Sequence, residues 1–114
     1  MTVLTRTLAL GVLVAACGGA RTLPANYAPT QAAISAADAV GARNEPRAAL
    51  HLKMARDQLV QAQALANDGK QDEARLMLER ARTDAEVALM VTREVSARAD
   101  AERAGREVDG LSRN

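Results

Sequence analysis

The sequence predicts an all-α fold, in which a short first helix is followed by an antiparallel hairpin of two long Ala-rich helices. Apolar residues after position 45 recur at alternating spacings of four and three, the spacing of a three-helix, coiled-coil-like arrangement. Aromatic residues make up only 1% of the 114 residues, so the core must be thin and built from small side chains. The run Asn67-Asp68-Gly69 divides the pattern into two long segments.

Residues 1–16 have the organisation of an export signal. Arg6 supplies the positive charge, and residues 8–16 are uncharged and mostly apolar. A helix of that length spans about 14 Å, far less than the roughly 30 Å hydrocarbon core of a bilayer, so this segment does not predict a transmembrane helix.

The run Val14-Ala15-Ala16-Cys17 resembles the lipobox of bacterial lipoproteins, and it contains the single cysteine of the chain. The resemblance implies that a diacylglyceryl group is attached to the Cys17 thiol and that a peptidase cleaves between Ala16 and Cys17. Gly18 follows, rather than Asp, which by the same resemblance implies sorting to the outer membrane, with the domain facing the periplasm. Several acyl chains together would hold the protein firmly to the membrane.

Residues 17–29 are predicted to be the lipidated cysteine and a flexible tether. The segment contains two glycines and two prolines, and its apolar residues show no helical periodicity. A tether of this length reaches at most about 40 Å when fully extended, so the domain would stay close to the membrane.

A helical domain is predicted for residues 30–108, with a short first helix capped by Thr30. Ile34, Ala37 and Val40 lie on one face of this helix, and residues 41–45 interrupt it. The second helix is expected from Pro46 to about Asn67, with a seam of Ala48, Leu52, Ala55, Leu59, Ala62 and Ala66.

Gly69 is expected to adopt the left-handed conformation that ends a helix. The third helix follows over residues 70–104, and residues 109–114 are expected to form a frayed tail. Its seam is predicted to contain Ala74, Leu78, Ala81, Ala85, Ala88, Thr92, Val95 and Ala99. Ion pairs three or four positions apart are expected between Glu79 and Arg82, Glu94 and Arg98, Asp100 and Arg103, and Glu102 and Arg106.

The sequence predicts no catalytic, cofactor-binding or metal-binding residue, and the protein is not expected to be an enzyme. His51 is the only histidine, and a metal site needs several such ligands. No Gly-rich phosphate loop, Ser nucleophile motif or Cys–His pair is found. Within the helical domain, Met54, Met77 and Met90 are interpreted as core filler. Without residues 1–16 the acidic and basic residues are equal in number, which gives no reason to expect nucleic-acid binding.

The helical part also resembles a domain-of-unknown-function family of Gram-negative lipoproteins, some of which continue into an OmpA-like peptidoglycan-binding domain. The resemblance covers about residues 28–104 and implies a fold and a compartment, with no catalytic residue to carry over. Its motifs are Ala28-Pro29, Ala55-Arg56-Asp57-Gln58-Leu59, Gly69-Lys70-Gln71-Asp72-Glu73-Ala74-Arg75, Ala81, Asp84-Ala85 and Ala88-Leu89.

Two functions are compatible with a lipid-anchored hairpin. In the first, the protein is a helical adaptor or scaffold that binds another protein of the cell envelope, because a thin core leaves apolar surface for a partner to bury. In the second, it is a self-associating structural spacer that resembles the murein lipoprotein. Gly69 interrupts the helix, and the residues after Leu111 include no lysine for attachment to the cell wall, so the adaptor is the expected function.

Overall fold

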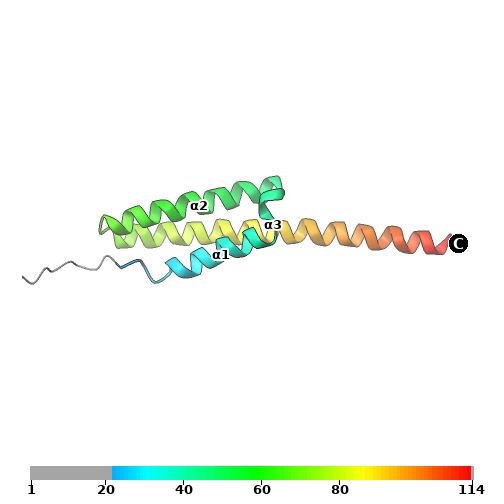
Figure 1. Cartoon of the computed structure of the whole chain (residues 1–114), viewed down its shortest axis with the longest axis horizontal. Coiled ribbons are helices and arrows are strands. Elements are labelled where there is room, and N and C mark those ends of the chain that lie inside the picture. Colours follow the sequence, from blue (N-terminus) through cyan, green and yellow to red (C-terminus); the bar gives the residue numbers. More distant parts are fainter. Residues whose placement is uncertain (1–21, 114) are drawn as a thin grey trace, which may run out of the picture.

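The computed structural model describes residues 22–113 and shows an all-α chain (Figure 1). Its elements are α1 (Tyr27–Ala39), the short 3₁₀ helix η1 (Ala42–Asn44), α2 (Pro46–Asn67) and α3 (Gln71–Ser112). No strand is found within the described range, so the predicted fold class is confirmed. The predictions for Ala16, Cys17 and Gly18 fall outside the described residues.

Helix α1 begins three residues earlier than the sequence predicts, and Thr30 is not its cap. Tyr27 N–H donates to the Pro24 carbonyl (2.9 Å), which closes the turn that starts the helix. The Thr30 side chain is fully buried, and its hydroxyl lies 2.7 Å from the Asn26 carbonyl and 3.3 Å from that of Leu78. Thr30 therefore packs α1 onto α3, and the predicted tether of residues 17–29 loses its last three residues to the helix.

The two turns of the domain both depend on a glycine with positive φ. Gly41 (φ 87°) ends α1, and Gly69 (φ 79°) lies between α2 and α3 as predicted. At the second turn, Gly69 N–H donates to the Ala66 carbonyl and Lys70 N–H to the Leu65 carbonyl, the hydrogen-bond pattern of a Schellman motif. This turn reverses the chain and makes α2 and α3 antiparallel.

Helix α2 has the bounds that the sequence predicts. Pro46 occupies its first turn, where a missing N–H does no harm, and the Glu45 carboxylate accepts a hydrogen bond from Ala48 N–H. Side-chain capping by Glu45 and the proline together fix where the helix begins.

The core is the seam between α2 and α3, with α1 packed alongside and running in the same direction as α3 (Figure 1). The predicted seam residues are buried, apart from partly buried Leu59 and the last two positions on α3. Most of them are alanines, which let the helix backbones approach closely but bury little apolar area each. Among residues 22–113, only Leu52, Leu78 and Thr30 are large side chains with full burial, so the core is thin, as expected.

Helix α3 is longer than α2 and continues well beyond the hairpin, where α2 has no residues to pack against it. Pro46, the first residue of α2, lies beside Thr92 and Val95 of α3. Val95 and Ala99, which the sequence places on the seam, are consequently exposed, as is every residue from 93 to 112. At 1.5 Å per residue this projecting part is about 30 Å long.

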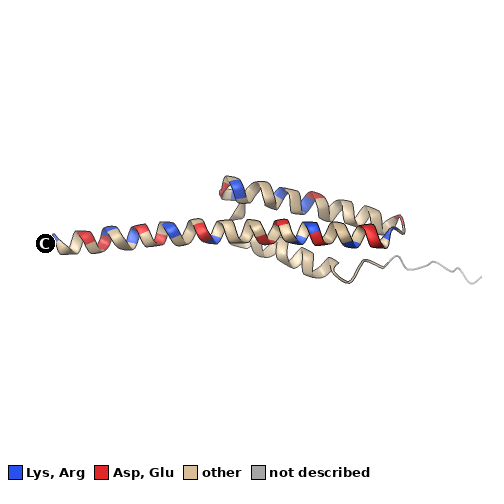
Figure 2. Ribbon diagram, turned by 180° about the vertical axis from the view of Figure 1, so that it is seen from behind, with Lys and Arg blue, Asp and Glu red and all other residues tan. Residues whose placement is uncertain are grey.

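The projecting part stays helical through Ser112, where the sequence predicts a frayed tail from residue 109. Acidic and basic residues alternate along its ribbon (Figure 2), and the predicted pairs Glu94–Arg98, Asp100–Arg103 and Glu102–Arg106 form. Arg113 donates to the Asp109 carbonyl, which satisfies one of the free acceptors at the C-terminal end. Within residues 22–113, no helix is apolar over a long enough stretch to cross a membrane.

Candidate functional site

Helix α1 covers one side of the α2–α3 seam and leaves the other side open. A hollow on the open side is lined by Gln61 and Leu65 of α2 and by Glu73, Leu76, Met77 and Arg80 of α3. Residues at spacings of three and four extend this surface along both helices. We call this surface the open face, and it consists of His51, Met54, Gln58, Gln61 and Leu65 on α2 and Leu76, Met77, Arg80, Asp84 and Val87 on α3.

The centre of the open face is a hydrogen-bonded group that joins the two helices. Asp84 lies 2.8 Å from His51 Nδ1 and accepts a 2.9 Å hydrogen bond from Gln58 Nε2. With its proton on Nδ1, His51 is the donor in the first contact. The carboxylate is only 17% exposed, so these two bonds largely replace its hydration. Gln58 Oε1 is buried and finds no hydrogen-bond partner in residues 22–113.

Side chains around this polar group expose apolar surface. Leu76 is 64% exposed and Met54 is 40% exposed. Met77 is half-buried, and Met90, on another face of α3, is mostly exposed. The interpretation of the methionines as core filler is therefore wrong for Met54 and Met90, because the Ala seam is too narrow to enclose side chains at its edges.

Sequence reasoning missed the pairing of His51 with Asp84, although a signal was present. Glu45 and Asp57 are the acidic residues near His51 in the sequence, but they contact Ala48 and Lys53 instead. In an antiparallel hairpin, however, residues at equal distances from the turn lie level with each other. His51 and Asp84 are almost equidistant from Asp68, so the turn position alone pairs them.

Replacing Asp84 with alanine is expected to lower the free energy of unfolding by about 1–3 kcal/mol, because His51 and Gln58 lose their shared acceptor in a partly buried place. Thermal unfolding followed by circular dichroism measures the loss. Asp57→Ala is the matched control, since Asp57 pairs only with Lys53 at an exposed position and should change stability by less than about 1 kcal/mol. Equal effects of the two substitutions would show that the His51–Asp84 contact does not stabilise the hairpin.

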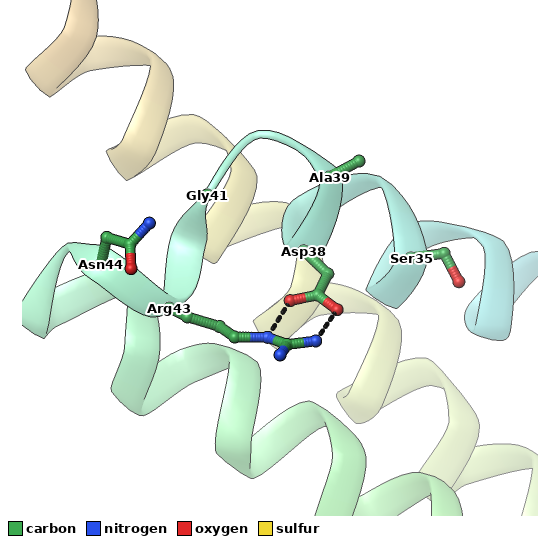
Figure 3. Close-up of a pocket in the computed structure, with 6 residues that line it drawn as sticks. All are labelled: Ser35, Asp38, Ala39, Gly41, Arg43 and Asn44. Atoms are coloured by element: carbon green, nitrogen blue, oxygen red, sulfur yellow. Dashed lines mark hydrogen bonds and ion pairs between the residues drawn. The ribbon is translucent and has the colours of Figure 1, made fainter.

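A second polar cluster lies at the corner where α1, η1 and α2 meet (Figure 3). Arg43 of η1 forms two hydrogen bonds with Asp38 of α1, and Arg56 of α2 donates a third at 2.8 Å. The Arg43 hydrogen bonds lower the pKa of the Asp38 carboxyl from its ordinary value; the charges of Arg43 and Arg56 act in the same direction, and desolvation opposes them. The cluster ties three elements together, and its carboxylate is already saturated by two guanidinium groups.

The lowered pKa of Asp38 makes the stability of this corner depend on pH. Because the pKa is lower in the folded than in the unfolded chain, its contribution is complete above the unfolded value near 3.9 and is lost as the pH falls through the folded value. Asp38→Asn is therefore expected to have a lower Tm than the wild-type chain at neutral pH. The difference should shrink below about pH 4, and a Tm difference that stays constant down to about pH 2 would contradict this assignment.

The structure does not test the absence of catalytic, cofactor-binding and metal-binding residues, which remains a prediction. Among the residues it describes, no three His, Cys, Asp or Glu side chains lie close enough together to hold a metal ion. Asp84 is bonded to His51 and Gln58, and Asp38 to two arginines, so neither carboxylate is arranged as a free acid or base.

Comparison with known proteins supports the family resemblance of the helical part. A search of curated proteins and a search of solved structures return no match. One family model, described as "Domain of unknown function (DUF4398)", matches residues 25–104. This range begins with the turn before α1, includes both turns and the open face, and ends within the projecting part of α3. The chain therefore belongs to the DUF4398 family.

Proposed function

We propose that this protein is a lipid-anchored adaptor or scaffold of the bacterial cell envelope. In this proposal Cys17 carries the lipid at the outer membrane, and the domain faces the periplasm and binds another envelope protein through its open face. The observation that carries the proposal is the exposure of Leu76 and Met54 on the same face as the partly buried Asp84 group. Apolar side chains around a desolvated polar centre are the composition expected of a protein-binding surface.

The core of the domain gives a physical reason for a partner. Alanine seams bury little area, and Leu52 and Leu78 are the only large apolar side chains with full burial in the described range. A helix laid along the open face would bury the exposed parts of Leu76, Met77 and Met54. The partner would in this way add apolar burial that the domain lacks by itself.

The position of the N-terminal segment suggests how the domain is oriented. Gln71 Nε2 donates to the Thr22 carbonyl (3.3 Å), and Asn26 Nδ2 donates to the Arg75 carbonyl (3.2 Å). The segment that follows the proposed lipid thus meets the domain at the α2–α3 turn, as Figure 1 shows. The turn would lie nearest the membrane, with the other end of α3 about 60 Å further away.

Site-specific photo-crosslinking in intact cells tests the proposal. A photoreactive residue at Leu76 is expected to capture one dominant envelope protein, which mass spectrometry would identify. The same residue at Gln31, exposed on α1 and away from the open face, is the control and should capture far less of that protein. If both positions yield the same mixture of proteins, or if Leu76 yields none, the adaptor function is contradicted.

The alternative function is a self-associating structural spacer that resembles the murein lipoprotein. The long exposed end of α3 favours it, because an isolated helix that carries apolar side chains is an unusual surface for a monomer. A spacer would give only crosslinks between copies of this chain, at Leu76 as well as elsewhere along the rod. An adaptor would instead give a crosslink from Leu76 to another protein, regardless of what the projecting end of α3 binds.

A further inference from the structure

The projecting part of α3 carries an apolar stripe on the side that faces away from the hairpin. Its members recur at spacings of three and four from Met90 onwards, with Glu94 as the single charged position. Ala97 follows Ala88 of the seam by nine positions, which places it about 180° around the helix. Met90, Val108 and Leu111 are 68%, 63% and 72% exposed. We call this surface the outward stripe, and it consists of Met90, Glu94, Ala97, Ala101, Ala104, Val108 and Leu111.

The charges beside the outward stripe are not all neutralised within the chain. Most charged residues of the projecting part form the three ion pairs described above. Arg93 and Glu107 form no ion pair with any residue in the range 22–113. In heptad terms both flank the stripe on the same side, fourteen positions apart, where residues from a packed helix would approach them.

We propose that the outward stripe binds a second copy of this chain, with the two α3 helices antiparallel. In the best register Met90 lies opposite Val108 of the second copy, and Ala97 lies opposite Ala101. The same register places Arg93 beside Glu107 of the second copy, twice by symmetry, so that these two charges neutralise each other. The helices overlap over residues 87–111, about 36 Å.

Other arrangements of two copies bring like charges together. A parallel pair sets Glu94 against Glu94 and places Arg93 beside Arg98 of the second copy. An antiparallel pair shifted by one heptad towards the C-terminus puts Glu94 against Leu111 and Asp100 beside Glu107. In the proposed register two pairs of like charges remain. Asp100 lies beside Asp100 of the second copy, and Arg98 lies beside Arg98 of the second copy. Each of these residues already forms an ion pair within its own helix. Charge pairing therefore favours the antiparallel direction, and it favours the proposed register over a shift towards the C-terminus.

The proposed pair leaves the rest of each molecule free. Most of each hairpin lies outside the overlap, which includes only its residues 87–92, and the open face stays uncovered except at Val87. The two α3 helices begin about 85 Å apart. The inference does not depend on the lipid anchor or on the adaptor function, since it uses only residues 87–111. If the adaptor function also holds, the result is a rod with a binding face near each end.

Cysteine pairs test the direction of the helices. Two differently tagged full-length copies, one with Met90→Cys and one with Val108→Cys, are expressed together and oxidised in intact cells. We expect a disulfide between the two tags and none when either variant is expressed alone, because identical positions lie about 27 Å apart in this register. Both sites are exposed, so neither substitution should impair folding. A strong disulfide from either variant alone indicates a parallel pair and overturns the proposal, as does the lack of any disulfide.

A charge exchange tests the register independently of the cysteines. Arg93→Glu or Glu107→Arg alone should weaken self-association about tenfold, because two attractions become two repulsions. The double variant R93E/E107R should recover it, since each pair is restored with its signs exchanged. The photo-crosslink from Leu76 to a foreign protein should not change in any of the three. In a parallel pair R93E would strengthen association instead, and either that result or a failure of the double variant to recover would refute the proposed register.

Discussion

Replacing Leu78 with alanine is expected to lower the free energy of unfolding by about 3–5 kcal/mol, enough to unfold much of the domain at physiological temperature. Leu78 is completely buried and is one of only three large side chains in that state in the part of the chain that the structure describes. The alanines of the seam around it have no long side chain that could move into the gap. The lost burial and the remaining cavity therefore both contribute in full.

Leu76 provides the matched control for this prediction. It lies two positions from Leu78 on the same helix and is 64% exposed. Both variants replace leucine with alanine within α3, so the change in helix propensity and in side-chain size is the same. Leu76→Ala should change the free energy of unfolding by less than about 1 kcal/mol. Urea unfolding followed by circular dichroism compares the two variants, and losses of similar size would contradict the seam described for α2 and α3.

The hairpin could be predicted from the sequence because its determinants are local. Pro46 and Gly69 each act on their own segment, one by starting a helix and one by reversing the chain. The alternating spacing of the alanines fixes which side of each helix faces the seam, and the structure confirms it as far as Thr92. Local signals of this kind need no knowledge of the partner helix.

The remaining features depend on contacts between distant residues. Thr30 looks like a helix cap in the sequence, yet its hydroxyl approaches the Leu78 carbonyl on α3, and α1 therefore starts earlier. The spacing pattern continues to Ala99, but burial stops where α2 begins, which no periodicity within α3 can reveal. The open face also depends on contacts between distant residues. His51, Gln58 and Asp84 come together only when the two helices are aligned by the turn.

Replacing Cys17 with serine is expected to move the protein from the membrane fraction to the soluble fraction, or to leave it as an uncleaved precursor. A serine hydroxyl cannot accept the thioether-linked lipid, so the anchor and the cleavage that follows it would both be lost. Each buried methylene contributes about 0.8 kcal/mol to membrane binding, and one acyl chain holds a protein only marginally, whereas several hold it firmly. No helix in residues 22–113 is apolar enough to span the bilayer in place of the anchor.

Thr22→Ser is the control for the anchor, because Thr22 is exposed and uses its backbone carbonyl to contact Gln71. It should leave both the distribution between fractions and the mass of the processed protein unchanged. Fractionation and mass spectrometry of the two variants distinguish the contribution of the lipid to membrane binding from that of all other contacts. A Cys17→Ser protein that remains membrane-bound and is processed normally would exclude lipidation at Cys17. It would not affect the pairing of the α3 helices, which needs no membrane.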